Sequence, residues 1–428
     1  MTSEQARLGV AHYPFIPGPA PLMVVRTEGS HLITDDGRRV LDAGGGAIVA
    51  NIGHGRPEVA EVAGRSLGEV DYVLPPWATP ARVALRDRLV RSWLPEGLTQ
   101  VGFLSGGSES TDSAIRLAHA HQRCAGRPGK WKVIGRWPSY HGVTLAGLAA
   151  GGHAGRRAGY DALLLDFPHI PWDDADALEA MIEAQGPDTV AAFIAEPVIG
   201  ASGGALVPED DYFPRVAEIC ARYDVLFIAD EVMTGFGRTG RNFAVDHWGV
   251  VPDILVGGKG MAGGYAAMGG IYAKPSVTEP IAATAHNFMF FTFGAQSAHC
   301  AVADTVLEIM EREDLVERSA KVGASLKERL ADRLGDHPHV AAVRGLGLML
   351  GLELVRQREP HTWFPPGFAA AVAAEALARG VWVYPCGGGD PVQDALLLGP
   401  PFTIRDDELD TLVDVLPQAI DAAAAAAS

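Results

Sequence analysis

Short apolar runs alternate with segments of helical periodicity along most of the chain. Between about residues 55 and 300 the apolar runs have the length of buried strands, and helical patterns such as 84–94 and 109–121 lie between or before them. Strands joined through helices run parallel. The pattern therefore predicts an α/β fold with a mainly parallel sheet that is covered by helices on both faces. The apolar runs are 131–137, 189–198, 225–232 and 253–259.

The pattern changes after about residue 298. One long helix is predicted over 298–334, and the alternating segment 339–354 reads as a strand of a sheet. Two further helices follow, at 369–380 and 405–427. These elements predict a second, smaller α+β domain. Near the start, 24–46 reads as a short hairpin with Asp36-Gly37 at its turn.

Composition and charge narrow the class of protein. The chain has 428 residues, of which 48% are hydrophobic and 20% charged, so it can bury large cores and is not a disordered chain. The net charge of −17 argues against a nucleic-acid or anionic membrane partner. No apolar run approaches the roughly 18 residues of a membrane span. The histidines lack metal-site spacing, so no metal is expected.

Cysteine usage and the first residues predict the compartment. No two of the four cysteines form a CxxC pair, which argues against a disulfide framework or a zinc ribbon and favours a reducing environment. The first residues do not combine a basic segment with an apolar one, as a signal peptide does. We therefore expect a cytoplasmic protein. The cysteines are Cys124, Cys220, Cys300 and Cys386.

A candidate anion site lies in the segment 103–118. A strand-like end runs into Ser105-Gly106-Gly107-Ser108, and a helical pattern follows at once. Small residues let backbone N–H groups approach an anion, and the N-terminus of a helix adds a favourable dipole. The segment predicts a phosphate-binding turn. An ordinary glycine turn with Ser108 as the N-cap explains the same residues.

A candidate acid follows another buried strand. Asp230 and Glu231 stand at the carboxyl end of the run 225–232, and ligands of open α/β sheets bind outside such strand ends. A buried carboxylate needs a cationic partner, because burial otherwise raises its pKa until it is neutral. Asp230 is therefore a candidate to bind a cationic group, and a purely structural acid is the alternative.

A candidate reactive amine ends the next apolar run. Lys259 stands among glycines, and a desolvated lysine has a lowered pKa that frees an amine for Schiff-base formation. A nucleotide-binding P-loop is excluded, because Gly260 rather than Ser or Thr follows the lysine. The glycine-rich run 345–351 alternates like a strand and is interpreted as core.

These three features together match the needs of pyridoxal 5'-phosphate. The lysine holds the aldehyde, the glycine turn holds the phosphate, and the acid keeps the pyridine nitrogen protonated. Tyr140, in the segment SYHG, adds an aromatic ring that can stack on the pyridine.

Nine segments in order carry a family resemblance. They are LDAGGGAIVANIGHGRPEV, SGGSES, YHG, AEPVIG, ADEVMTGFGRTG, LVGGKGMAGGY, FFTFGAQSAHCA, VRGLGLMLGLEL and GPPFTI. The chain resembles the class III aminotransferases of fold-type I, and looks closest to the omega-amine:pyruvate transaminases. The resemblance covers nearly the whole chain. It implies a large cofactor-binding domain over 51–297, a small domain over 298–428, and an N-terminal segment, 1–50, that joins the small domain.

The resemblance also implies roles for individual residues. Lys259 would form the Schiff base and then move the proton, and Asp230 would pair with the pyridinium nitrogen. Val232 and Tyr140 would pack on the two faces of the ring. The remaining cofactor-binding residues would be Gly106, Gly107 and Ser108 at the phosphate, Thr292 donated to the phosphate across a homodimer interface, Glu196 as a support of the cofactor pocket, and His141.

The substrate positions depart from the ornithine and GABA branches. Ala201 stands where those enzymes carry a gating glutamate, and Leu397 stands where ornithine-type enzymes carry an arginine. The expected substrate pocket contains Ile48, Trp77 and Tyr140. Ile48 and Trp77 are apolar, which suits an amine that lacks a carboxylate. The alternative is that both belong to the core.

The expected reaction is a ping-pong transfer of an amino group. The donor is an amine or omega-amino compound, and the acceptor is a keto acid such as pyruvate or 2-oxoglutarate. An aminomutase like the glutamate-1-semialdehyde enzyme, or another pyridoxal-phosphate enzyme of this fold, is the alternative. A non-catalytic ligand sensor is disfavoured by the intact Lys259.

Overall fold

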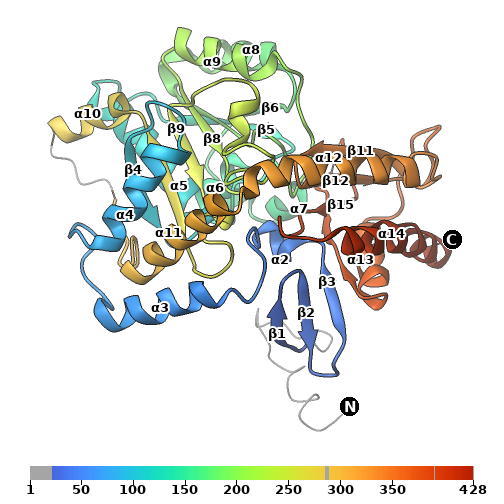
Figure 1. The fold of residues 1–428 in the computed structure, drawn as a ribbon. Coiled ribbons are helices and arrows are strands. Elements are labelled where there is room, and N and C mark those ends of the chain that lie inside the picture. Colours follow the sequence, from blue (N-terminus) through green and yellow to red (C-terminus); the bar gives the residue numbers. More distant parts are fainter. Residues whose placement is uncertain (1–21, 285–288, 390, 428) are drawn as a thin grey trace.

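A seven-stranded sheet forms the centre of the protein in the computed structural model, which describes residues 22–284, 289–389 and 391–427 (Figure 1). All strands of this sheet are parallel except β10, which runs antiparallel to both neighbours. The predicted, mainly parallel sheet is thus confirmed. In sheet order the strands are β4 (Gln100–Leu104), β10 (Gly269–Ala273), β9 (Ile254–Gly257), β8 (Leu226–Asp230), β7 (Val190–Ala195), β5 (Lys132–Trp137) and β6 (His169–Pro171).

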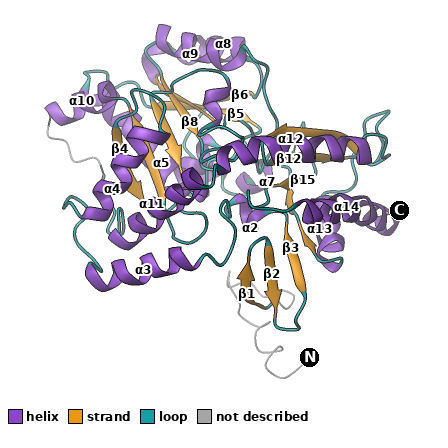
Figure 2. Cartoon of the chain, in the orientation of Figure 1, coloured by secondary structure: helices purple, strands orange, loops and turns teal. Residues whose placement is uncertain are grey.

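Helices cover both faces of this sheet (Figure 2). Because successive side chains of a strand point to opposite faces, Ile194 of β7 packs with Ile115 of α5, whereas Phe193 packs with Phe213 of α9 in a separate cluster. The four inner strands β7, β8, β9 and β10 are therefore buried along their whole length. The helices around the sheet are α3 (Pro57–Glu69), α4 (Pro80–Arg88), which continues as a π-helical turn (Leu89–Trp93), α5 (Gly107–Cys124), α6 (Leu145–Ala150), α7 (Ala154–Arg157), α8 (Ala175–Gln185), α9 (Tyr212–Arg222) and α10 (Pro275–Ala283).

Two smaller sheets lie beside the central one. The predicted hairpin forms from β2 (His31–Thr34) and β3 (Arg39–Asp42), with β1 (Val24–Glu28) at its edge, and β13 (Val381–Trp382) pairs in parallel with β3. Strands from the two ends of the chain therefore share one sheet. The division at residues 50 and 297 stays a prediction, and its first 21 residues lie outside the described part. The other sheet contains β11 (Val340–Leu346), β12 (Met349–Leu354), β15 (Ala395–Leu398) and β14 (Tyr384–Cys386), and α13 (Phe368–Ala378) and α14 (Asp406–Ala427) pack nearby.

The predicted long helix over 298–334 is wrong. The structure has two helices, α11 (Ser297–Arg312) and α12 (Leu315–Leu334), which are separated at Asp314 by a left-handed φ of +49°. The segment 339–354 likewise forms two strands, because the chain turns at Gly347, where a side chain would collide with the backbone of Thr239.

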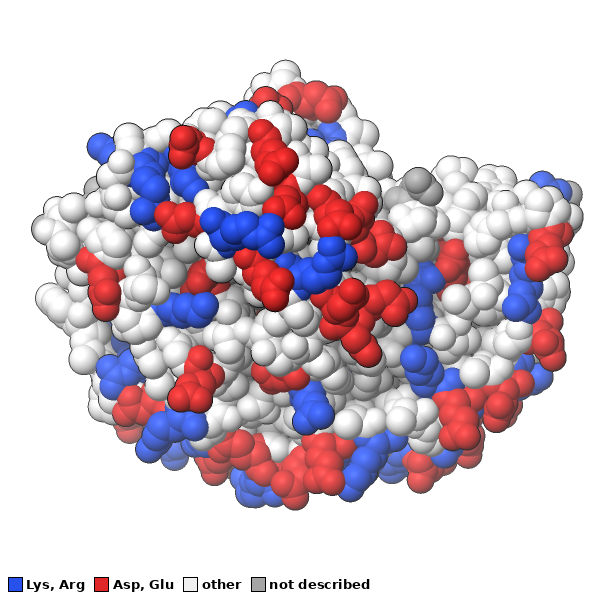
Figure 3. All heavy atoms as spheres, turned by 90° about the horizontal axis from the view of Figure 1, so that it is seen from above, with Lys and Arg blue, Asp and Glu red and all other residues white. Residues whose placement is uncertain are grey.

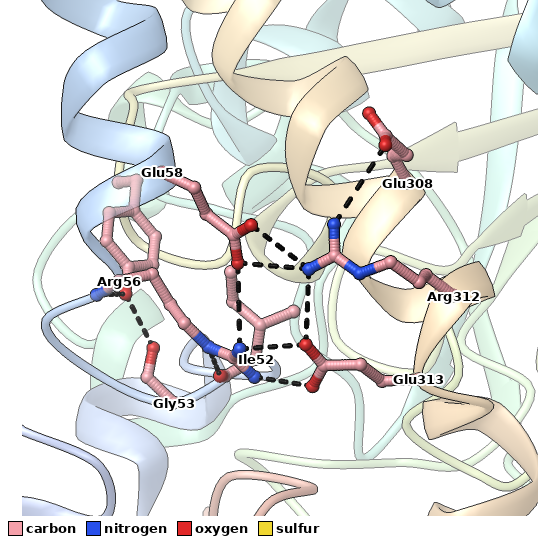
Figure 4. A network of polar contacts seen from close by, with 8 residues as sticks. Ile52, Gly53, Arg56, Glu58, Glu308, Arg312 and Glu313 are labelled. Carbon is pink, nitrogen blue, oxygen red and sulfur yellow. Dashed lines mark hydrogen bonds and ion pairs between the residues drawn. The ribbon is translucent and has the colours of Figure 1, made fainter.

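Ion pairs fix the start of α3 to the junction of α11 and α12 (Figure 4). The guanidinium of Arg56 donates to both carboxylate oxygens of Glu313 at 2.8 and 2.7 Å. Arg312 lies 3.0 Å from Glu58 and 4.0 Å from Glu308. A bidentate arginine–carboxylate pair is directional as well as attractive, so this network fixes the position at which the helix breaks.

The outer surface carries charges of both signs. Figure 3 shows acidic and basic side chains interspersed over the face that is seen from above. Within the described ranges, none of the helices combines the length and the apolar character that crossing a bilayer requires.

Candidate active site

A cavity of about 180 Å³ lies at the carboxyl ends of four central strands. Asp230 ends β8, Glu196 follows β7, Lys259 follows β9, and Tyr140 and His141 follow β5. The first turn of α5 closes the cavity from the side. The lining residues are Gly107, Ser108, Thr111, Tyr140, His141, Gly142, Glu196, Asp230, Val232, Met233 and Lys259.

A larger surface hollow of about 1060 Å³ lies elsewhere, between α12 and the segment 239–247. None of the residues that the sequence singles out for chemistry lines it. The smaller cavity brings together an amine, two carboxylates, an imidazole and a helix N-terminus, and we therefore take it as the candidate active site.

Asp230 is held in place by two hydrogen bonds. Its Oδ2 lies 2.7 Å from Nδ1 of His141, and its Oδ1 accepts a hydrogen bond from the backbone N–H of Val232 at 3.1 Å. The carboxylate is 5% exposed. A carboxylate that is fixed and shielded from water in this way can hold a cationic nitrogen with little competition from solvent.

Lys259 has an unusual backbone and an unusual amine. Its φ of +41° lies in the left-handed region, which costs an L-residue about 1 kcal/mol and is typical of functional sites. Burial lowers the pKa of its amine to about 8; the charge of Arg238 acts in the same direction, whereas Glu196 and Asp230 oppose it. A larger share of the side chain is therefore neutral, and nucleophilic, at physiological pH than in an exposed lysine.

Glu196 supports the cavity from β7. Its carboxylate accepts hydrogen bonds from the backbone N–H groups of Tyr140, at 2.8 Å, and Gly200, at 3.1 Å. Burial raises the pKa of this carboxyl group, with Asp230 adding to the effect, while His141 and the two backbone donors lower it. Glu196 thus links the turn after β5 to the turn after β7.

Glycines shape the floor of the cavity. A Cβ on Gly107 would come within 2.8 Å of Cγ1 of Val232, and one on Gly258 would come within 3.3 Å of the same atom. Gly142, at φ +104°, packs against Ser108, whose Oγ would lie 2.6 Å from an added Cβ. Only glycines therefore allow Val232 and Ser108 to lie this close to the start of α5.

Two buried polar atoms of the lining residues have no partner among the described residues. They are Oγ1 of Thr111 and Nε2 of His141. Buried polar groups are nearly always hydrogen-bonded, so these atoms call for a polar ligand. An amine for an aldehyde, a fixed carboxylate for a protonated ring nitrogen, and a helix N-terminus for a phosphate are together the donor set that pyridoxal 5'-phosphate needs. The residues present fit that cofactor.

Eight of the predicted cofactor-binding residues line this one cavity, and their individual roles remain predictions. Two others do not line it: Gly106 lies just before α5, and Thr292 lies exposed in a turn. The predicted pocket residue Ile48 is buried in an adjoining apolar cluster with Tyr140. Trp77 is 59% exposed and lines a different surface hollow with Phe103.

Sequence reasoning missed Thr111, Gly142 and Met233, which also line the cavity. Thr111 follows Ser108 by three residues, which places both on one face of α5. Its signal was therefore helical spacing from a residue already singled out. Met233 and Gly142 are direct neighbours of Val232 and His141.

Solved transaminases have this fold. A thermostable (S)-enantioselective omega-transaminase from Thermomicrobium roseum superposes with a TM-score of 0.92 and is 34% identical, with 99% of each chain covered. A transaminase from the marine bacterium Virgibacillus gives a TM-score of 0.90 at 32% identity, over 96% of this chain and 94% of that one. The protein therefore has the fold-type I architecture of a transaminase.

The family follows from sequence comparison. The family model described as class III aminotransferase matches residues 17–420. An uncharacterised aminotransferase of Bacillus subtilis is 34% identical, with 93% of this chain and 94% of that one covered. The putrescine–pyruvate aminotransferase of Pseudomonas aeruginosa is 32% identical, over 94% and 91% of the two chains. The chain belongs to the class III aminotransferases, which depend on pyridoxal phosphate, and it is a transaminase.

Proposed function

We propose that this transaminase binds pyridoxal 5'-phosphate and moves an amino group from an amine or omega-amino donor to a keto acid, pyruvate or 2-oxoglutarate, by a ping-pong mechanism. The observation that carries the proposal is the shared cavity of Lys259, Asp230 and the N-terminus of α5. The amine suits the aldehyde of the cofactor, the carboxylate suits its ring nitrogen, and the helix N-terminus suits its phosphate.

The chain holds the cofactor at three places in this proposal. Nζ of Lys259 binds the aldehyde carbon, and Asp230, fixed by His141, pairs with the ring nitrogen. Backbone N–H groups at Gly107 and Ser108, with Gly106 beside them, bind the phosphate. Val232 and Tyr140 pack on the two faces of the ring, and Glu196 keeps the Tyr140 turn in place.

Once bound, pyridoxal phosphate supplies the electron sink that weakens the Cα–H bond of the donor. The incoming donor amine would displace Lys259 from the aldehyde carbon. The released Lys259 amine, whose pKa burial lowers to about 8, would then act as the general base that accepts the Cα proton. The same amine would then deliver this proton to the former aldehyde carbon. Positioned proton transfer of this kind contributes about 10²–10⁴-fold to a rate. Asp230 would stay paired with the ring nitrogen throughout.

The apolar wall favours a donor that carries no carboxylate near its reacting carbon. Ile48, Ala201, Met233 and Leu397 form a buried cluster against which Tyr140 packs. An unpaired carboxylate pressed against such a wall would lose its hydration without compensation. The putrescine–pyruvate relative, which is named for a diamine donor, supports the same class of substrate.

A homodimer in the cytoplasm completes the proposal. Thr292 is exposed and does not line the cavity of its own chain, so we infer that it reaches the phosphate site of a partner subunit. The exposed Trp77 is then expected to border the partner's cavity. All four cysteines are unpaired, which suits a reducing compartment.

The test is a donor screen with purified holoenzyme and pyruvate, in which alanine formation is measured. We expect turnover with putrescine or an arylalkylamine to exceed turnover with ornithine or GABA. Initial rates at several fixed donor concentrations should give parallel double-reciprocal lines. Faster turnover of ornithine would refute the donor class, and isomerisation of an amino aldehyde without any acceptor would indicate an aminomutase instead.

A further inference from the structure

An arginine whose guanidinium has no hydrogen-bond or ion-pair partner among the described residues lies close to the candidate active site. Arg156 belongs to the short helix α7, and its guanidinium carbon lies 5.2 Å from the ring centroid of Tyr140, which lines the Lys259 cavity. The Arg156 side chain is exposed. In the described part of the chain it has neither a hydrogen bond nor an ion pair.

Arg157, the chain neighbour of Arg156, and three arginines that are buried or half-buried are already engaged in hydrogen bonds. Arg157 donates to three backbone carbonyls, each at 2.8 Å. Arg344 is bound to a glutamate and two carbonyls, and Arg238 to two carbonyls and an asparagine. Arg136 donates to two carbonyls. Arg156 is therefore the member of this group whose guanidinium N–H donors have no acceptor within the described ranges.

The surroundings hold Arg156 beside Tyr140. The ring of His153 meets the Tyr140 ring edge-on at 6.4 Å. Behind it, the added Cβ of Gly388 would lie 3.4 Å from the His153 ring, so the loop after β14 supports the start of α7. A guanidinium over an aromatic ring is stabilised there while its in-plane N–H groups stay available.

The charge of the cavity explains why such a cation is needed. The lining residues include two carboxyl groups, Glu196 and Asp230, and a single lysine, which the cofactor occupies in the proposed function. A keto acid is an anion, and the apolar wall offers no group to pair with it. Guanidinium groups bind carboxylates through two parallel hydrogen bonds.

We propose that Arg156 binds the carboxylate of the keto acid acceptor at the rim of the cavity and so makes the site specific for a 2-oxo acid. This assignment rests on the proposed function. It also explains how one cavity serves both half-reactions: the amine donor contacts the apolar wall, whereas the acceptor adds an ion pair with Arg156. Arg156 is thus a specificity-determining residue, and it takes no part in proton transfer.

The test compares an acceptor that carries a carboxylate with one that does not. Holoenzyme variants are assayed with one saturating amine donor and either pyruvate or butanal as the acceptor. In Arg156→Gln we expect the KM for pyruvate to rise about ten- to a hundredfold, as the loss of a charged hydrogen-bonded pair predicts. The kcat at saturating pyruvate and the KM for butanal should stay within twofold of the wild type.

Two further variants make the result specific. Arg156→Lys keeps the charge but lacks the planar pair of donors, and its KM for pyruvate should lie between those of the wild type and Arg156→Gln. Arg65→Gln removes a charge from α3, far from the Lys259 lining in the fold, and should change neither KM. Because the Arg156 side chain is exposed and makes no hydrogen bond in the described structure, the melting temperature of Arg156→Gln should match the wild type.

Several outcomes would overturn the assignment. An unchanged KM for pyruvate would show that the arginine does not bind the acceptor. An equal rise of KM for pyruvate and butanal would show that Arg156 only supports Tyr140. If the wild-type holoenzyme forms neither alanine from pyruvate nor glutamate from 2-oxoglutarate with any amine donor, the proposed function itself fails, and this assignment fails with it.

Discussion

Asp230 and Lys259 place opposite charges at the ends of the adjacent strands β8 and β9, and the site depends on this arrangement. Most of the cavity was predictable at the residue scale, because Gly107, Ser108, Tyr140 and Lys259 each follow a strand-like run in a short, distinctive motif. Thr111 was missed, because its side chain reaches the cavity only through the helical turn of α5 that separates it from Ser108. Only the structure shows that its hydroxyl is buried without a hydrogen-bond partner among the described residues.

Replacing Asp230 by asparagine tests the pairing with the ring nitrogen. The amide keeps the shape of the side chain but cannot hold a cation, so we expect kcat to fall about 100-fold or more. Glu231→Gln is the matched control, because the Glu231 carboxylate faces Thr234, Ala244 and Val245 rather than the cavity. Glu231→Gln should lower the melting temperature, while its kcat per bound cofactor stays within a few-fold of the wild-type value. A near-normal kcat for Asp230→Asn would contradict the pairing.

The pKa of Lys259 predicts a pH dependence of stability for the cofactor-free protein. Burial lowers this pKa from 10.5 to about 8. Below pH 8 both the folded and the unfolded chain hold the proton, and the folded state bears the full cost of the buried charge. Between pH 8 and 10.5 only the unfolded chain holds it, so this cost is progressively relieved as the pH rises.

Lys259→Met removes that titration. Relative to the variant, the wild type should therefore gain thermal stability between pH 7 and pH 10. Differential scanning fluorimetry of both proteins without cofactor measures the difference. A difference in melting temperature that does not change with pH would mean that Lys259 is not desolvated.

At the element scale, the start of α5 and the end of β9 enclose Val232 between two glycines. The existence and type of the central strands were predictable because their apolar runs are bounded by glycines and polar residues. The reversed strand β10 was not predicted, since an apolar run does not encode its direction. The break between α11 and α12 was also missed, because helical periodicity continues across Glu313 and Asp314, and contacts such as Arg56–Glu313 decide where the helix ends.

Two glycine-to-alanine substitutions, one at the cavity and one in α3, test the glycine floor. Gly107→Ala places a Cβ 2.8 Å from Val232 and should push that side chain toward the ring site. Since overpacking of this kind is costly, we expect pyridoxal phosphate to bind about tenfold more weakly or worse. Gly64→Ala, in α3 and outside the cavity lining, meets no atom within 4 Å, so its affinity should match the wild type. Equilibrium dialysis measures both, and equal affinities would contradict the cofactor placement.

On the scale of the whole molecule, a group of exposed aromatic side chains remains without cover. Tyr72 contacts Phe293 edge-on at 6.4 Å, and Phe293 is 61% exposed next to Thr292. Exposed apolar groups of this kind mark interaction surfaces. Neither this surface nor the sharing of one sheet by β3 and β13 follows from local sequence pattern, because each is decided by contacts between distant or separate segments.

Phe293→Glu tests the proposed dimer. A charge at this position should prevent association, and the resulting monomer should bind pyridoxal phosphate more weakly because Thr292 no longer reaches a partner's phosphate site. Sedimentation velocity gives the mass, and dialysis gives the affinity. Val251→Glu, at a similarly apolar exposed position elsewhere, is the control and should stay dimeric. A wild type that sediments as a monomer with full activity would contradict the proposal.

The identity of the amine that binds the cofactor is the central claim, and chemical trapping measures it directly. Purified protein is incubated with pyridoxal phosphate, reduced with borohydride, digested and mapped by mass spectrometry. One pyridoxyl group per chain, attached to Lys259 and absent from Lys259→Arg, is the predicted result. A protein that stays colourless and unlabelled, or one whose label resides on another lysine such as Lys130, would contradict it.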